Sequence, residues 1–149
     1  MMERDELREH FFSTYVTLRY GMAAIALAFP LLLYGIGQFV YGIGLENSMS
    51  HYYFALSPDD VSKRGFPMRV WFVGILFAVG VFLYLYKGFS TKENLALNFA
   101  GIFALGVAVF PMGSDCVKDC QPFSAHGACA VALFLCIAFV SLFCAKDTL

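Results

Sequence analysis

The fold is decided by an uncharged stretch of 26 residues, Tyr20–Leu45, which reads YGMAAIALAFPLLLYGIGQFVYGIGL. A helix of about 20 apolar residues crosses a hydrocarbon core about 30 Å thick, so this stretch is long enough to span a membrane. Three further windows without Asp, Glu, Lys or Arg follow it, at Val70–Tyr86, Asn94–Ser114 and Gln121–Ala145. Together the four windows hold 89 of the 149 residues, and all 21 charged residues lie outside them. The sequence therefore predicts a polytopic membrane protein.

The composition separates the chain from soluble proteins and from membrane barrels. Hydrophobic residues make up 60% of the chain and charged residues 14%, against about 45–50% and about 25% in soluble proteins. The windows lack the alternation of polar and apolar residues that is typical of barrel strands. We therefore expect an all-α integral membrane protein, a four-transmembrane-helix antiparallel bundle that forms a single domain over residues 1–149. Its spans are predicted at about residues 16–40, 69–87, 94–112 and 125–145.

Short connections and basic residues predict how the chain sits in the membrane. Ser90 and Glu93 have the spacing of a capping box, which predicts a tight link before the third span. With both termini on one side, that side carries six basic residues and the opposite side four. The positive-inside rule then places both termini in the cytoplasm, and we expect the bacterial inner membrane as the location. The first apolar window is too long for a signal-peptide core, so we expect it to be a retained helix.

Small residues recur at helical spacing in every span. Tyr34–Gly37 and Tyr41–Gly44 have the same sequence, Tyr-Gly-Ile-Gly, and their seven-residue offset predicts a glycine strip on one helix face. Close helix packing is one interpretation of this strip, and contact between its backbone and a ligand is the other. We interpret the small residues as packing positions that also leave faces for subunit contacts. The set comprises Gly35, Gly37, Gly42, Gly44, Gly74, Ala78, Ala100, Ala104, Ala108, Ala128 and Ala132.

Side chains that can carry chemistry gather at the predicted outward end. Ser48, Ser50 and His51 lie in the first connection, and His126 begins the fourth span. Serine and histidine are ingredients of hydrolytic or metal-binding sites, so these four residues are the candidate catalytic residues. Polar residues inside or at the edges of the spans include Gln38 and Asn98. Either a functional role or a hydrogen bond to a neighbouring helix explains such intramembrane residues.

Two cysteines lie four residues apart in the third connection. Cys116 and Cys120 would face the oxidising side of the membrane, which makes them a candidate disulfide. With His126 they also form a weak candidate metal site, but zinc requires four ligands and no second ligand pair occurs in the chain. We therefore expect no metal and no cofactor.

The chain resembles a family of uncharacterised bacterial multipass membrane proteins from about Tyr15 to Leu149. The residues that carry the resemblance are Ser48-Met49-Ser50-x-Tyr52-Tyr53, Arg69-x-x-Phe72-Val73-Gly74, Tyr84-x-Tyr86-Lys87-Gly88-Phe89, Ala100-Gly101, Phe110-Pro111 and His126-Gly127. The family implies no established activity. Its members carry His after the Tyr-Tyr pair and Asp after the Arg, where this chain has Phe54 and Val70. If a Ser/His/Asp set forms a hydrolase site in the relatives, as in alkaline ceramidase-like proteins, this chain lacks two of its members.

Three classes of function remain open at this point. We expect first a non-enzymatic oligomeric component, such as a pore, a membrane effector or a subunit of a membrane complex, because the spans hold no deep acid or base. An intramembrane metal- or Ser/His-dependent lipid hydrolase at the outward mouth is one alternative. A small-solute transporter subunit is another. The expected partners are the lipid bilayer and either further copies of the chain or a membrane or cytoplasmic protein. A net charge of −1 predicts no nucleic-acid partner.

Overall fold

A computed structural model of the chain describes residues 4–55, 67–88, 90–112 and 124–144, and these residues are helical with short connections. Helix α1 runs over Arg4–Tyr41, α2 over Pro67–Leu85, α3 over Thr91–Val109 and α4 over Ala125–Phe139. A 3-10 turn, η1, covers Met49–Tyr53, and a π-helical turn, η3, continues α4 over Val140–Cys144. The described residues contain no strand.

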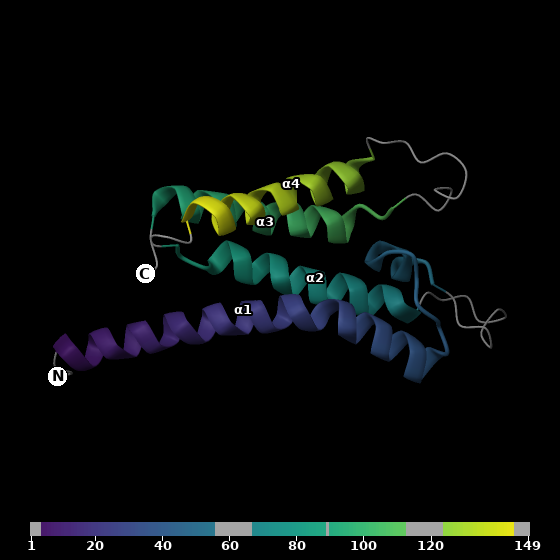
Figure 1. Cartoon of the computed structure of the whole chain (residues 1–149), viewed down its shortest axis with the longest axis horizontal. Helices are drawn as coiled ribbons and strands as arrows, with labels where there is room; N and C mark the ends of the chain where they lie inside the picture. The colour runs from purple at the N-terminus through teal and green to yellow at the C-terminus, as the bar shows by residue number, and fades with distance from the viewer. Residues whose placement is uncertain (1–3, 56–66, 89, 113–123, 145–149) are drawn as a thin grey trace.

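Four helical segments are long and apolar enough to cross a membrane: Asp5–Tyr41, Pro67–Leu85, Thr91–Val109 and Ala125–Cys144. The segments alternate in direction, so the first residues of α1 and the last residues of α4 lie at the same end of the molecule (Figure 1). The predicted fold class, an all-α membrane protein with four antiparallel spans, is therefore confirmed. We call the end that holds the start of α1 the terminal end, and the opposite end, which holds η1, the loop end.

The helices pack in chain order. Helix α2 packs against α3, and α3 packs against α4, while α1 packs against α2 and η1. In the described part of the chain, the backbone of α1 makes no close approach to α3 or α4. The first and last helices are therefore separated, and a cavity described below lies between them.

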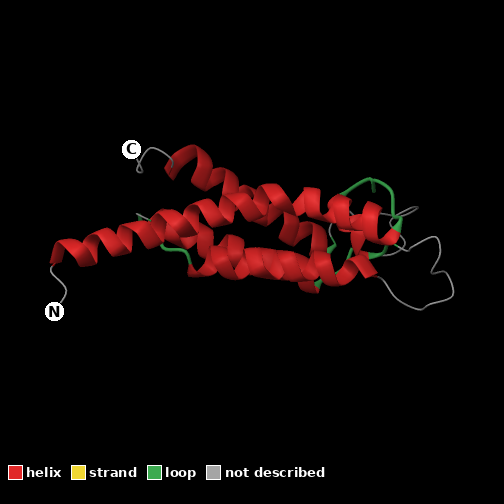
Figure 2. Cartoon of the chain, turned by 90° about the horizontal axis from the view of Figure 1, so that it is seen from below, coloured by secondary structure: helices red, strands yellow, loops and turns green. Residues whose placement is uncertain are grey.

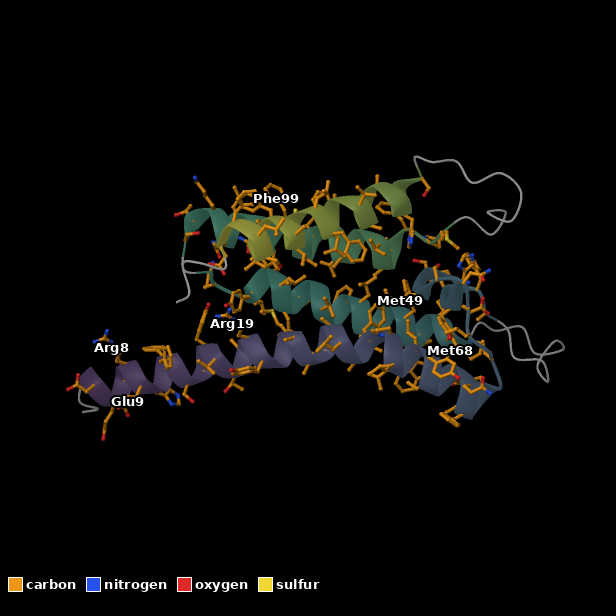
Figure 3. All side chains as sticks on the ribbon, in the orientation of Figure 1. Arg8, Glu9, Arg19, Met49, Met68 and Phe99 are labelled. Carbon is orange, nitrogen blue, oxygen red and sulfur yellow. The ribbon has the colours of Figure 1, made fainter. Side chains whose placement is uncertain are left out.

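The first helix is longer than the bilayer requires. Its 38 residues rise about 57 Å at 1.5 Å per residue, against a hydrocarbon core of about 30 Å. It begins at Arg4, well before the predicted start near residue 16, and its first turns project beyond the other helices (Figure 2). These turns hold charged side chains such as Arg8 and Glu9 (Figure 3). Hydropathy predicts the part of the helix that lies in the membrane. It does not predict that the helix continues through the polar residues before that part.

The predicted glycine strip is only half helical, which corrects the sequence interpretation. Helix α1 ends at Tyr41, and Gly42 has a φ of 66°, a left-handed conformation that favours glycine. The Ile43 N–H turns back and donates to the Gly37 carbonyl at 2.8 Å. The second copy, Tyr41–Gly44, therefore forms the helix end and the following turn. The two copies do not share a helix face.

Helices α2 and α3 form the closest pair, and glycines make this approach possible. A Cβ atom placed on Gly101 would lie 2.6 Å from the Gly80 carbonyl oxygen and 2.8 Å from the Tyr84 nitrogen. The link between the two helices is capped as predicted, because the Ser90 hydroxyl accepts a hydrogen bond from the Glu93 N–H at 3.1 Å. At this crossing the two backbones therefore lie in direct contact, and a side chain on Gly101 would separate them.

Aromatic rings join α1 to the hairpin at both ends of the molecule. Towards the loop end, the Phe72 ring of α2 lies 5.8 Å from the Phe29 ring of α1 and 6.2 Å from the Tyr53 ring of η1. At the terminal end, the Tyr86 hydroxyl donates to the Tyr15 hydroxyl. Burial and this hydrogen bond raise the pKa of the Tyr86 phenol above its usual value.

Candidate functional site

The candidate site lies at the loop end, where η1 meets the end of α3 and the start of α4. Each of these three elements supplies one group. Ser50 comes from η1, His126 is the second residue of α4, and Phe110 follows the last residue of α3. The three residues are far apart in sequence, and the fold brings them together.

Local sequence explains why α4 presents His126 at its start. The Ser124 hydroxyl caps the helix by accepting a hydrogen bond from the Gly127 N–H at 3.0 Å. This cap fixes the first turn of α4, in which the His126 side chain is only 6% exposed. The imidazole is thus held inside the protein at the boundary between the membrane span and the connection.

Both ring nitrogens of His126 have a partner. Nδ1 lies 2.7 Å from the Phe110 carbonyl oxygen, and Nε2 lies 3.0 Å from the Ser50 hydroxyl. A carbonyl oxygen can only accept, so Nδ1 carries a proton and donates to it. In the neutral imidazole Nε2 is then the acceptor, and the Ser50 hydroxyl donates to it. The backbone of α3 therefore fixes the tautomer in which His126 can take a proton from Ser50.

Phe110 is able to orient the ring because it ends α3. Its N–H closes the last turn by donating to the Gly106 carbonyl at 2.8 Å, while its own carbonyl lies beyond the helix. Pro111 follows and, having no N–H, cannot extend the helical hydrogen bonds. The carbonyl is therefore free to accept the hydrogen bond from Nδ1 of His126.

A second serine–histidine pair lies next to the first. The Ser48 hydroxyl is 2.7 Å from Nδ1 of His51, three residues further along the chain. Ser48 is exposed and His51 is half-buried. This pair connects neighbouring residues of one turn, whereas the Ser50–His126 pair joins segments 76 residues apart. The four predicted catalytic residues therefore form two separate pairs.

Aromatic side chains seat η1 on the bundle. Tyr52 is 3% exposed, and its hydroxyl donates to the Gly44 carbonyl at 3.2 Å. Its ring lies over Gly37, where a Cβ would come within 3.0 Å of it. On the other side, the Arg69 guanidinium lies 4.5 Å from the centre of the Tyr53 ring. These contacts hold the turn that carries Ser50.

The two positions at which the resemblance predicts further site residues are placed differently. Phe54 packs edge-on against Tyr53 at 4.8 Å, directly beside the turn that holds Ser50. Val70 is 74% exposed and lies on the outer side of α2, in a groove shared with α1. A side chain at position 70 therefore points away from the core of the bundle.

The remaining predicted residues do not join this site. Gln38 is exposed on α1, and the buried Asn98 side-chain oxygen of α3 has no hydrogen-bond partner, as is also true of Asn94. Ala100, Ala104 and Ala108 are buried along α3. Positions with no neighbouring atom within 4 Å of an added Cβ are Gly35, Gly44 and Gly74. Ala78 and Ala132 are half-buried and Ala128 is exposed.

The weak candidate metal site combines His126 with two cysteines of the third connection. Cys116 and Cys120 lie outside the described residues, so both the disulfide and the metal hypotheses remain untested there. Within residues 4–55, 67–88, 90–112 and 124–144, no three His, Cys, Asp or Glu side chains converge as metal ligands would.

Family models, curated proteins and solved structures give no match. The resemblance to a family of uncharacterised bacterial membrane proteins therefore stays a prediction.

Proposed function

We propose that the chain is a membrane-embedded hydrolase that cleaves acyl esters of lipids with Ser50 as nucleophile and His126 as general base. The observation that carries the proposal is the 3.0 Å contact between the Ser50 hydroxyl and Nε2 of His126, with Nδ1 oriented by the Phe110 carbonyl. A nucleophile, a base and a group that orients the base form the usual signature of an activated serine. The proposal uses neither position 54 nor position 70.

The depth of the pair supports a lipid substrate. Phe110 lies one residue beyond the end of α3, and His126 lies in the first turn of α4. If these helices span the hydrocarbon core, the pair is at its edge, where the polar headgroups begin. The ester bonds of glycerolipids lie at the same boundary. A lipid ester could thus reach Ser50 from the bilayer without leaving it.

In the proposed reaction the Ser50 oxygen attacks the ester carbonyl while its proton passes to Nε2 of His126. The imidazolium then gives that proton to the departing alcohol, which leaves the acyl group on Ser50 as an ester. Water, deprotonated by the same nitrogen, attacks the acyl-serine, and the proton returns to the Ser50 oxygen as the fatty acid leaves. Nδ1 keeps its proton throughout, because it donates to the Phe110 carbonyl.

A fluorophosphonate probe tests this proposal. We expect the purified chain in lipid vesicles to be labelled at Ser50, as located by peptide mass spectrometry. The Ser50→Ala variant should lose the label, whereas Ser48→Ala, which removes the neighbouring serine–histidine pair, should keep it. Release of fatty acid from phosphatidylglycerol vesicles should likewise be lost in Ser50→Ala and kept in Ser48→Ala. Labelling of Ser48, or undiminished labelling of Ser50→Ala, would overturn the proposal.

We propose further that the chain lies in a bacterial inner membrane with both termini in the cytoplasm. Support comes from the six basic residues on the terminal side against four on the other. In this orientation the Ser50–His126 pair faces outward. Impermeant thiol reagents should label Cys116 and Cys120 in intact cells after reduction. Labelling only after the membrane is opened would reverse the orientation.

The second candidate function is that of an oligomeric membrane component, and one groove favours it. Between α1 and α2, on the outer side of the bundle, a groove of about 580 Å³ is lined by apolar residues alone. Small residues four apart face it from both helices: Ala24 and Ala28 from α1, and Gly74 and Ala78 from α2. Such surfaces let a further helix approach closely in a membrane. The partner proposed for this groove is a second copy of the chain.

Bulky substitutions in the groove test the oligomeric function. We expect Gly74→Leu and Ala78→Leu to shift native mass spectra of the detergent-solubilised chain from dimer to monomer, because leucine fills the space a second helix would occupy. Ala128→Leu, at an exposed position of α4, serves as the matched control and should leave the spectrum unchanged. A parent protein that is monomeric in both detergent and nanodiscs would end this second candidate.

A further inference from the structure

A cavity of about 310 Å³ lies among the helices on the side towards the terminal end. Helix α1 contributes Met22 and Ala26, α2 contributes Phe82, and α4 with η3 contributes Ile137 and Val140. It occupies the space between the first and last helices, whose backbones make no close approach in the described residues. Its volume is at the lower end of the range of about 300–1,000 Å³ that ligand pockets have.

The lining is apolar apart from two residues, Arg19 and Ser141. Arg19 is exposed on α1. Figure 3 shows its place on α1 next to the end of α2. Arg19 forms no ion pair or hydrogen bond with the residues that the structure describes. The cavity thus combines apolar walls with one cation, Arg19, which has no ion-pair partner among the described residues.

We propose that this cavity holds one acyl chain of an anionic phospholipid whose phosphate binds Arg19. The guanidinium supplies the charge and the paired N–H donors that a phosphate requires. The apolar walls favour an acyl chain over a hydrated ligand, and residues of all four helices line the cavity. Charge complementarity with Arg19 therefore selects an anionic lipid over a zwitterionic one.

The proposed lipid site is distinct from the Ser50–His126 pair. Ile137 lies eleven residues beyond His126 along α4, which corresponds to about 16 Å at 1.5 Å per residue. A lipid whose phosphate binds Arg19 has its headgroup at the terminal end and its ester far from Ser50. This lipid is a bound component of the protein and not the substrate of the proposed hydrolase.

Quenching by brominated lipids tests the site. The chain has a single tryptophan, Trp71, which faces the outer groove. In a Trp71→Phe background, Phe82→Trp places an indole in the cavity wall. We expect chain-brominated phosphatidylglycerol to bind at this indole about fivefold more tightly than brominated phosphatidylcholine, since one basic residue near a membrane surface contributes about 1 kcal/mol.

Matched variants separate the cavity from general charge and packing effects. Arg19→Gln should reduce the ratio of the affinities for phosphatidylglycerol and phosphatidylcholine to about one. Arg8→Gln, on the projecting turns of the same helix, should leave this ratio unchanged. Ala26→Phe fills the cavity and should reduce quenching by both lipids. Ala24→Phe, which points into the outer groove, should not reduce it.

Three results would overturn the proposal. The first is an equal affinity of both lipids for the parent protein. The second is an equal loss of preference in Arg8→Gln and Arg19→Gln. The third is an indole that neither lipid quenches because a second subunit covers it, as native mass spectrometry would show.

Discussion

Replacing His126 by alanine is expected to lower the rate of fluorophosphonate labelling of Ser50 by about 10²- to 10⁴-fold, the usual contribution of a general base. The reason is the loss of Nε2, which lies 3.0 Å from the Ser50 hydroxyl and accepts its proton. The rate is measured from the fraction of intact protein that carries the probe mass over time. His51→Ala is the matched control and should be labelled at the parent rate, because His51 contacts Ser48.

His126 also joins η1 to the end of α3, so the alanine variant alone could lose labelling by losing structure. His126→Asn separates the two effects. Its side-chain amide can still donate to the Phe110 carbonyl, as Nδ1 does, but it has no nitrogen that can take a proton. We expect the thermal unfolding midpoint of His126→Asn to be closer to that of the parent than the midpoint of His126→Ala is. Both variants should be labelled by the probe equally slowly. Labelling of His126→Asn at the parent rate would show that the pair is structural.

Replacing Gly101 by alanine is expected to destabilise the fold by about 1–3 kcal/mol, the typical cost of overpacking a tight contact. The added Cβ would lie 2.6 Å from the Gly80 carbonyl oxygen and 2.8 Å from the Tyr84 nitrogen. Both are backbone atoms, so no side-chain rotation relieves the contact and α2 must move. The measurement is thermal unfolding of the detergent-solubilised protein, and Gly101→Val should yield little or no folded protein.

Gly21→Ala provides the control for this substitution. Gly21 lies within α1, and no atom of the described residues lies within 4 Å of an added Cβ there. Alanine has the higher helix propensity, by about 0.8–1.0 kcal/mol in water, so the midpoint should stay or rise slightly. Equal destabilisation by Gly21→Ala and Gly101→Ala would contradict the packing argument for α2 and α3.

The sequence was sufficient to predict the four spans because hydropathy and length report directly on what a bilayer accepts. It was not sufficient for the close pairing of α2 and α3. Gly80 and Gly101 make that contact, yet the small residues chosen from their spacing include neither. Spacing shows which residues share one helix face but not which face meets the next helix. The second Tyr-Gly-Ile-Gly copy was misplaced for a similar reason, since Gly42 serves there to end the helix.

The candidate site could be predicted only in its residue types. The sequence predicts Ser50 and His126 as candidate catalytic residues, but it predicts Ser48 and His51 equally well. The fold distinguishes them, because Tyr52 anchors η1 on the bundle and Ser50 then lies next to Nε2 of His126. The third member, the Phe110 carbonyl, gives no sequence signal because every residue has a backbone carbonyl. The Phe110 carbonyl can orient the imidazole of His126 only because Phe110 lies at the end of α3.

The Ser50–His126 contact determines how the first and last helices are joined. At the loop end, the Ser50–His126 contact joins the connection that follows α1 to the start of α4. Towards the terminal end, the cavity separates the two helices. The first and last helices are thus connected through η1 at the loop end and separated by the cavity towards the terminal end. The proposed lipid can therefore exchange with the bilayer while the hydrogen bond between Ser50 and His126 stays in place.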